Sequence, residues 1–302
     1  MRPAARPAAS SNRARDPRPD GPNRQVSAAN DFPPGRPYRV SARQLEDVAA
    51  SLTDHDRDVL QLVARLRIVS GDQLRRALWW QGPKANAERR CRRALRRLAT
   101  WRVVERVPGR TVGGARAGSD GFLYCVGSVG GRLLARDGQQ PRRLAAPGSR
   151  YIAHTLAVAE LVVGLGEAER AGRLEVLGVE SEPTCWRRFT GPMGARLVLK
   201  PDLFVRIGVG SLEDRWLIEM DMASESPATI ARKGRSYLAH YRSGSEQSRH
   251  GVYPRVLWSV PDARRAEVVT RALSGLPSEA WRLFSVCTHR EVVGRLAEEA
   301  SS

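Results

Sequence analysis

The segment between residues 85 and 101 constrains the fold of this chain more than any other. Its apolar residues recur at helical spacing: Cys91, Ala94, Leu95 and Leu98. One side of a helix formed by this segment can therefore be buried. Arginines fill the rest of the surface, with only Glu88 as a nearby acid. Unbalanced like charges repel each other unless an anion neutralises them. The pattern favours a helix that binds a polyanion, and a solvated charged face is the alternative.

Two shorter helices are predicted before this segment and two strands after it. Thr53 is predicted to cap the first helix, and Ser70, with Gln73 three residues later, the second. Strands are predicted at 103–107 and 122–126, around a turn rich in Gly and Arg. Three helices followed by a hairpin predict a winged helix-turn-helix over residues 45–148.

In such a module the third helix enters the major groove of double-stranded DNA and the hairpin lies along the backbone. The residues expected to contact DNA are one lysine, the six arginines of the helix and two arginines of the turn: Lys84, Arg89, Arg90, Arg92, Arg93, Arg96, Arg97, Arg110 and Arg116. Phosphate contacts carry no sequence information, so the target sequence is not predicted.

The charge distribution supports a polyanion as partner. The 302 residues include 50 Lys and Arg against 32 Asp and Glu. Residues 38–150 hold 23 basic and 10 acidic side chains, whereas residues 151–302 hold 20 and 19. One basic module is therefore joined to a nearly neutral one.

The composition of the N-terminal segment, the apolar stretches and the cysteines narrows the classes of protein to consider. Residues 1–44 are rich in Pro and Arg, and with so little apolar surface they are predicted to form a disordered basic arm. No uninterrupted apolar stretch approaches the roughly 20 residues of a membrane-spanning helix, and the four cysteines lie far apart. We expect a cytoplasmic protein with free thiols and no membrane partner.

Residues 149–302 predict a second domain that alternates helices and strands. The expected order is helix 154–168, strands 174–179, 197–207 and 215–222, helix 226–242, strand 252–260, helix 262–273, strand 283–287 and helix 290–299. A helix, three strands, a helix and a strand form the αβββαβ core of restriction-endonuclease-like domains. The expected fold class is α/β, in the α+β sense, with this domain following the winged helix.

Carboxylates gather on the central strands of this second domain. Glu219 and Asp221 alternate along one strand and share a face, and Asp202 on the preceding strand can lie opposite them. Pro201-Asp202 followed by Glu219-Met220-Asp221 resembles the PD-(D/E)XK nuclease motif. Asp221 stands where that motif has its lysine, and Lys233 on the next helix can supply the missing ammonium.

The resemblance implies a divalent metal, Mg²⁺ or Mn²⁺, and hydrolysis of a phosphodiester. The implied metal ligands are three carboxylates: Glu160, Asp202 and Glu219. The implied catalytic residues are Asp202, Glu219, Asp221 and Lys233. For each residue alone, a structural role such as a solvated strand face or an ion pair is the competing interpretation.

Over residues 50–300 the chain resembles the replication-relaxation family of plasmids and mobile elements. The resemblance rests on the winged-helix start, the helix His154–Glu160, Lys200-Pro201-Asp202, Glu219-Met220-Asp221 and the helix Lys233–Tyr241. It implies a role in plasmid or mobile-element replication and DNA processing.

Two functions stay open at this point: a metal-dependent DNA nickase or endonuclease, and a non-catalytic DNA-binding regulator or replication accessory factor with a degenerate nuclease fold. A P-loop is absent, because none of the three lysines follows a glycine and precedes Ser or Thr. Association into a homodimer, or with other replication or conjugation proteins, also stays open.

Overall fold

The computed structural model describes residues 40–111, 121–139 and 147–299. These residues belong to one unit, in which helices pack against β-sheets. The predicted class, a mixed α/β protein, is thereby confirmed.

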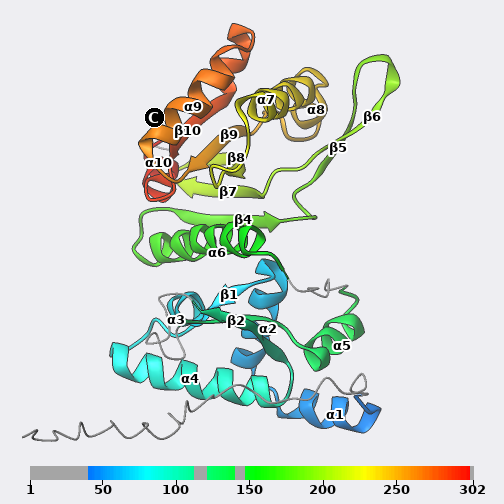
Figure 1. Cartoon of the computed structure of the whole chain (residues 1–302), viewed down its shortest axis with the longest axis vertical. Helices are drawn as coiled ribbons and strands as arrows, with labels where there is room; N and C mark the ends of the chain where they lie inside the picture. Colours follow the sequence, from blue (N-terminus) through cyan, green and yellow to red (C-terminus); the bar gives the residue numbers. More distant parts are fainter. Residues whose placement is uncertain (1–39, 112–120, 140–146, 300–302) are drawn as a thin grey trace, which may run out of the picture. The chain divides into compact units, whose positions relative to one another are not determined.

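The first part of this unit combines helices with a small antiparallel sheet (Figure 1). Its elements are α1 (Ala42–Ser51), α2 (Asp54–Leu66), β1 (Val69–Ser70), α3 (Gly71–Leu78), α4 (Lys84–Thr100), β2 (Val104–Thr111), β3 (Phe122–Val126) and α5 (Ser128–Arg136). The strands lie in the order β1-β3-β2. The sequence did not predict α1, β1 or α5, and α1 begins inside the segment 1–44 expected to be an arm.

Side-chain caps explain where the helices of this part begin. The Thr53 hydroxyl accepts the N–H of Asp56, and the Asp56 carboxylate accepts the N–H of Thr53. Ser70 and Gln73 form the same reciprocal pair at the start of α3. Each box satisfies two N–H groups that the first helical turn leaves without a partner, so both predicted starts are confirmed.

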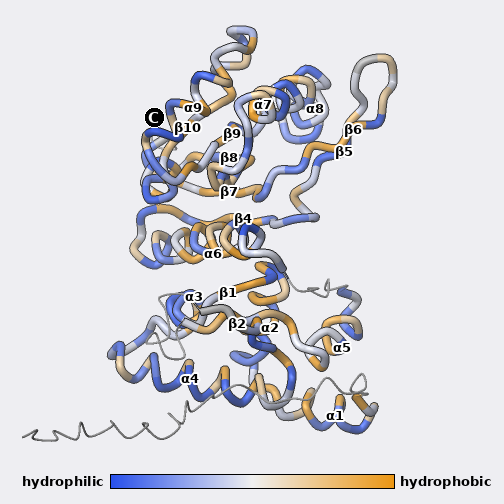
Figure 2. Tube along the Cα trace, in the orientation of Figure 1, coloured by the Kyte–Doolittle hydropathy of each residue, from blue (hydrophilic) through white to orange (hydrophobic). Residues whose placement is uncertain are grey.

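Helix α4 buries one narrow side, as its sequence predicts. Its buried residues are Ala87, Cys91, Ala94, Leu95 and Leu98. The rest of the helix is hydrophilic, which Figure 2 shows as a mostly blue segment.

The second part is built on a five-stranded sheet. Its elements are α6 (Ser149–Arg170), β4 (Glu175–Ser181), β5 (Arg187–Thr190), η2 (Pro192–Gly194), β6 (Arg196–Leu199), β7 (Leu203–Val209), β8 (Leu212–Met220), α7 (Pro227–Arg242), α8 (Ser245–His250), β9 (Arg255–Val260), α9 (Ala263–Ser274), η3 (Ser278–Leu283), β10 (Phe284–Thr288) and α10 (Val292–Glu299). The sheet order is β10-β9-β8-β7-β4, and β5 pairs with β6 alone. Strands β4, β7 and β8 are antiparallel neighbours, whereas β8, β9 and β10 run parallel.

Alternation along the strands sends neighbouring side chains to two separate cores. Leu203 and Ile218 pack in the core that contains α6 and α10. Phe204 and Leu217, one residue away on each strand, pack in the core that contains α7 and α9. Residues of β8 with the parity of Leu217, including Glu219, therefore face α7.

The predicted strand 197–207 is wrong in one respect, because the structure divides it. Strand β6 ends at Leu199 and β7 begins at Leu203, with Pro201 between them. Proline has no N–H to donate to a strand ladder, which favours a break there. The first piece pairs with β5 in a hairpin that the sequence did not predict, and α8 was not predicted either.

Helix α6 has the length and composition of a membrane-spanning helix, with a mean hydropathy of 1.3. Half of the most apolar stretch of this helix is buried inside the protein. The helix contributes Ala159 and Leu165 to the core that also contains α10. Core helices also have this composition, so the feature is weak evidence for a membrane span. Glu160, inside the apolar run of this helix, is exposed.

Candidate functional site

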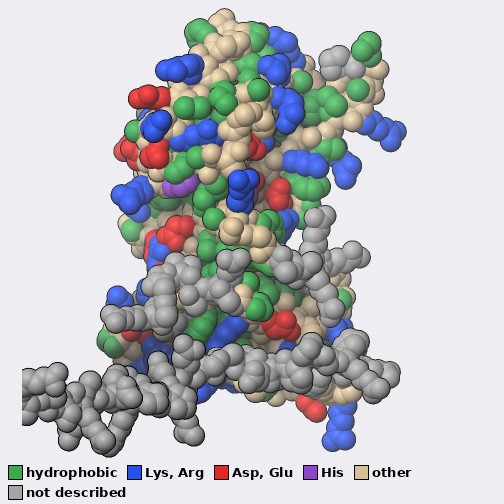
Figure 3. Space-filling view, in the orientation of Figure 1, with side chains coloured by type: hydrophobic (Ala, Val, Ile, Leu, Met, Phe, Trp, Pro, Cys, Tyr) green, Lys and Arg blue, Asp and Glu red, His purple; other side chains and the backbone are tan. Residues whose placement is uncertain are grey.

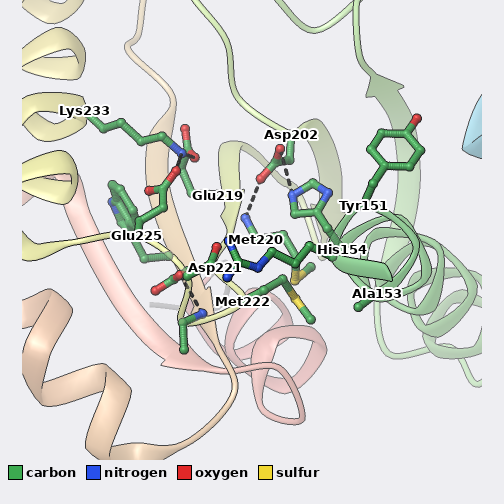
Figure 4. Close-up of a pocket in the computed structure, with 14 residues that line it drawn as sticks. Tyr151, Ala153, His154, Asp202, Glu219, Met220, Asp221, Met222, Glu225 and Lys233 are labelled. Carbon is green, nitrogen blue, oxygen red and sulfur yellow. Dashed lines mark hydrogen bonds and ion pairs between the residues drawn. The ribbon is translucent and has the colours of Figure 1, made fainter. Parts of the chain in front are cut away.

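A cavity of about 550 Å³ opens where β8 ends, between α6 and α7 (Figure 4). Its lining comes from several elements: Arg150, Tyr151, Ala153, His154, Asp202, Glu219, Met220, Asp221, Met222, Ala223, Ser224, Glu225, Lys233 and Trp258. Four of these residues, Asp202, Glu219, Asp221 and Lys233, are the catalytic residues that the sequence predicts.

Asp202 is fixed against the neighbouring strand by its backbone and its side chain. Its N–H donates to the carbonyl of Ile218 at 3.0 Å, and its Oδ2 accepts the N–H of Met220 at 2.7 Å. The other oxygen, Oδ1, lies 3.2 Å from Nε2 of His154 on α6. The hydrogen bond to Asp202 raises the pKa of His154, against the opposing effect of burial.

Glu219 is buried on the α7 side of β8, as its parity requires. Its Oε2 lies 2.9 Å from Nζ of Lys233, and its Oε1 accepts the hydroxyl of Tyr237 at 2.6 Å. Burial raises the pKa of Glu219 to about 7, and the charge of Asp202 adds to the rise, while Lys233 opposes it. The carboxylates of Asp202 and Glu219 repel each other when both are ionised, and a cation bound between them would relieve that repulsion.

Lys233 reaches the cavity because α7 begins directly after the loop that follows β8. Ser226 caps the helix by accepting the N–H of Thr229, and Pro227 occupies its first turn. The ammonium also contacts Oε1 of Glu225 at 2.8 Å. Burial lowers the pKa of Lys233, but Glu219 and Glu225 more than offset this effect, so the pKa is raised and the lysine stays charged.

Glu225 brings a further carboxylate oxygen to the cavity. Its Oε2 is buried and has no hydrogen-bond partner within the described part of the chain. An unsatisfied buried oxygen is costly, and a bound cation or water would satisfy it.

Asp221 lies just beyond the end of β8 and is neutralised by Arg265 of α9. The guanidinium of Arg265 contacts both carboxylate oxygens, with Nη2 at 3.1 Å from Oδ1, and the N–H of Ala223 donates to the same oxygen at 2.9 Å. The side chain of Asp221 is 1% exposed. Asp221 therefore lines the cavity but is held in an ion pair with the next helix.

Glu160, predicted as a metal ligand, lies outside the cavity. Its Oε1 is 2.6 Å from Nη1 of Arg76, and its Oε2 accepts the side-chain amide of Gln73. Glu160 follows His154 by six residues, and at 3.6 residues per turn this places the two on different sides of α6. The helix that brings His154 to Asp202 thus directs Glu160 toward α3.

The residues predicted to bind DNA fall into two groups on α4. Six are exposed: Lys84, Arg89, Arg90, Arg92, Arg93 and Arg96. Arg97 differs, because its Nη2 lies 2.6 Å from Oδ1 of Asp56, whose side chain is 1% exposed. This pair connects α4 to the capped start of α2, so Arg97 has a structural role. The side chain of Arg110 and all of Arg116 lie outside the described residues.

Three of the exposed arginines line a groove of about 400 Å³ at the start of α4. The groove is formed by Gln81, Gly82, Pro83, Asn86, Arg89, Arg90 and Arg93.

Several residues in or next to the cavity were not predicted from the sequence as part of a site. Tyr237 contacts Glu219 from behind the cavity, and it follows Lys233 by four residues, so the two share a face of α7. His154 was noted as part of a family motif without a role. Nothing in the local sequence connects Arg265 with Asp221, because 44 residues separate them.

The family model described as Replication-relaxation matches residues 60–256, more than half of the chain. The chain belongs to the replication-relaxation family. No curated protein matches it. Membership of the replication-relaxation family indicates a role in plasmid or mobile-element replication or in DNA processing. The matched region includes α4 and three cavity residues, Asp202, Glu219 and Lys233.

The cavity contains oxygen donors of the type that a magnesium-type cation would require. Asp202 and Glu219 offer carboxylate oxygens from adjacent strands, and Glu225 adds the unpartnered oxygen. Among the described residues, no group of three or more His, Cys, Asp or Glu side chains is arranged so that it could hold a metal ion by itself. Mg²⁺ usually takes one or two protein carboxylates and completes its shell with water and substrate phosphate.

Proposed function

We propose that this member of the replication-relaxation family binds double-stranded DNA and cleaves a phosphodiester bond in it with a divalent metal. The first part of the chain would recruit DNA, and the cavity at the end of β8 would carry out the reaction. Each half of the proposal has its own support.

The DNA-binding half rests on the arrangement of α2, α3, α4 and the sheet of β1, β2 and β3. Helices followed by an antiparallel pair of strands fit a winged helix-turn-helix, with α4 as the helix that enters the major groove. Its exposed cations lie opposite its buried side. Arginines in this position suit phosphate contacts at the groove edges.

The second half rests on the order α6, β4, β7, β8, α7 and β9. The antiparallel β7–β8 pair followed by a parallel β8–β9 pair fits a restriction-endonuclease-like core, with β5 and β6 as an insertion. In that core the carboxylates of the nuclease motif would lie where β7 begins and β8 ends.

One observation carries the catalytic proposal. Asp202, Glu219 and Lys233 come from three different elements and meet in one cavity, although the sequence separates the first from the last by 31 residues. A lysine that has moved from the strand to the next helix restores the residue types of the nuclease motif.

The roles of the residues follow from their contacts. Asp202 and Glu219 would hold Mg²⁺ or Mn²⁺, which when bound supplies positive charge to the scissile phosphate and to the attacking water. His154 donates to Asp202 and Tyr237 donates to Glu219, so each carboxylate has a fixed orientation. The ammonium of Lys233, which contacts Glu219 and Glu225, would also donate a hydrogen bond to a water in the cavity.

The alternative function is a DNA-binding regulator or replication accessory factor with a degenerate nuclease fold. It is favoured by the ion pairs of the site. Asp221, at the lysine position of the motif, is neutralised by Arg265, and Lys233 is already paired with two carboxylates.

Nicking of supercoiled plasmid DNA by the full chain, with Mg²⁺ or Mn²⁺, tests the proposal. We expect Asp202→Asn and Lys233→Gln each to lower the rate by about 100-fold or more, since each change removes an electrostatic contribution of several kcal/mol to the transition state. Glu267→Gln is the control, because this exposed carboxylate of α9 lies outside the cavity, and its rate should stay within about threefold of wild type.

Two results would contradict this assignment. Equal nicking by wild type and Asp202→Asn would place the reaction elsewhere. Salt-dependent DNA binding without nicking under either metal would favour the regulator over the nuclease.

A further inference from the structure

The hairpin of β5 and β6 forms a second basic surface, far from α4 in the sequence. It extends away from the five-stranded sheet in Figure 1, and its strands pair only with each other. One of its faces is anchored, because Phe189 and Leu199 are buried in the core that contains α7. The hairpin therefore has a fixed base and an exposed outer face.

The cations of the hairpin lie on that outer face. Register pairs Arg188 with Val198 and Thr190 with Arg196, so these residues share one side, and Lys200 continues it two residues after Val198. We call Arg188, Arg196 and Lys200 the ribbon cations. All three are exposed, and Figure 3 shows basic side chains in blue over this part of the surface.

The ribbon cations lack the acidic partners that surround other arginines of this domain. Residues 187–200 contain no Asp or Glu. No ion pair joins a ribbon cation to a carboxylate in the described ranges, and Lys200 instead lies over the ring of Trp186 at 4.5 Å. By contrast, Arg187 on the inner face pairs with Glu180 and Glu246. Three unbalanced positive charges in a row favour an anionic partner.

A groove continues this surface at the base of the hairpin. It measures about 550 Å³ and is lined by Glu180, Thr184, Trp186, Arg187, Arg188, Phe204, Arg206, Arg215, Glu246, Arg249 and His250. Arg206 and Arg215 share a single carboxylate, Glu213. Arg249 of α8 is exposed and, within the residues that the structure covers, forms no ion pair.

The shape of this positive surface favours a long polyanion over a small one. A single phosphate or nucleotide would be satisfied inside the groove, but the cations continue past it along the hairpin to Arg196. Arg188 lies opposite Val198, so Arg196 and Lys200 are its diagonal neighbours at about 7–8 Å. This spacing is about twice the rise of roughly 3.4 Å per phosphate that one strand of B-DNA has along the helix axis.

We propose that the ribbon cations, with Arg249, form a second DNA-binding surface that contacts the phosphate backbone of duplex DNA. This inference rests on the proposed action on DNA, but on neither α4 nor the cavity. Arg206 follows Asp202 by four residues of β7, so the groove lies about 13 Å along the strand from the proposed cleavage site. A duplex held at the hairpin is anchored beside that site as well as at α4.

The test measures duplex affinity of the full chain by fluorescence anisotropy, with a 30-base-pair duplex over a range of salt concentrations. The ribbon variant is Arg188→Gln, Arg196→Gln and Lys200→Gln together. The control variant, Arg264→Gln, Arg271→Gln and Arg282→Gln, removes the same charge from exposed positions on α9 and η3. A third variant, Arg90→Gln, Arg93→Gln and Arg96→Gln, removes the exposed charge of α4.

We expect the ribbon variant to bind duplex at least about tenfold more weakly at low salt. The slope of log affinity against log salt should be less steep by about 2 to 3, because up to three phosphate contacts are lost. The control should stay within about threefold of wild type. Equal melting temperatures of ribbon variant and wild type will show that the fold is intact.

The outcomes separate this surface from the function proposed above. A ribbon variant that behaves like the control overturns the second surface, while loss in the α4 variant alone leaves the winged helix in place. Loss in the ribbon variant with a single strand but not with duplex also overturns it as stated. A wild type that binds no DNA at all removes both proposals.

Discussion

At the scale of single residues, His240 on α7 gives the clearest link between burial and pH. Its Nδ1 lies 3.1 Å from the hydroxyl of Tyr253, and its ring packs against Phe189. Burial lowers the pKa of His240 to about 4, and the positive charges of Arg187 and Arg249 contribute, although Glu246 lies 3.8 Å from Nε2. The histidine is therefore neutral in the folded protein at pH 7.

This depressed pKa predicts a loss of stability in mild acid. The unfolded chain binds the proton near pH 6.5 and the folded chain only near pH 4, so the unfolding free energy falls as pH drops through that window. The contribution of His240 between pH 7 and pH 5 is about 2 kcal/mol. Urea unfolding at both pH values should show a smaller decline for His240→Gln than for wild type. Equal declines would mean that His240 does not titrate differently on folding.

The residues of the cavity show what the sequence can and cannot predict at this scale. Lys233 was predicted because the start of its helix and its distance along the chain from Glu219 can be read directly from the sequence. Lysine is also rare in this chain, which has three among its 50 basic residues. The partners of Asp221 and Glu160 were not predicted, because Arg265 and Arg76 come from distant segments. A carboxylate in a motif is visible in the sequence, whereas the cation that neutralises it depends on tertiary packing.

At the scale of elements, capping signals predicted the starts of helices well. Thr53, Ser70 and Ser226 cap helices where the sequence places them, since a cap depends only on residues within one turn. The hairpin β5–β6 was missed because the alternation from 197 to 207 continues through Pro201. Only the pairing of β6 with β5, rather than with the main sheet, divides that pattern into two strands.

Replacing glycine by alanine at two helical positions should have opposite effects on the stability of the protein. A Cβ on Gly130 of α5 would lie 2.1 Å from the carbonyl oxygen of Val103, whereas a Cβ on Gly294 of α10 meets nothing within 4 Å. Gly130→Ala should destabilise the protein by about 2 kcal/mol or more, because the helix must move off β2. Gly294→Ala should stabilise it by about 0.5–1 kcal/mol through helix propensity.

Chemical denaturation of both variants checks this pair. Both variants add the same methyl group to a helix. Unfolding free energies that change in opposite directions would therefore reflect the close approach of α5 to the backbone of Val103. A neutral or stabilising Gly130→Ala would show that α5 is not held at that distance.

At the scale of the described molecule, α3 and α6 connect the proposed DNA-binding part to the sheet that carries the cavity. Arg76 of α3 is the centre of this contact. Its Nε and Nη2 contact both oxygens of Glu167 at 2.8 and 2.6 Å, and its Nη1 contacts Glu160. The hydrogen bond from Arg76 lowers the pKa of Glu167, which places a charged, two-point pair between the two parts.

This contact predicts a measurable coupling between the two parts. Arg76→Gln should lower the unfolding free energy by about 1–2 kcal/mol, a moderate value because the carboxylates are partly exposed and screened by solvent. Arg75→Gln is the control, since within the described ranges Arg75 forms its ion pair with Asp72, one turn away in the same helix, and the change should cost about 0.5 kcal/mol.

A double-mutant cycle with Glu167→Gln isolates the pair from other effects of each change. Because the interaction is charge-assisted and two-point, we expect a coupling energy of about 1 kcal/mol at low salt that declines at about 1 M salt. A coupling energy near zero would mean that other contacts hold α3 and α6 together, namely the hydrogen bonds of the Gln73 amide to Leu156 and Glu160 and the shared core that includes Leu74 and Ala159. In that case Arg76→Gln would also leave the duplex affinity and the nicking rate unchanged, whereas a real coupling makes the position of α4 relative to the cavity depend on this arginine.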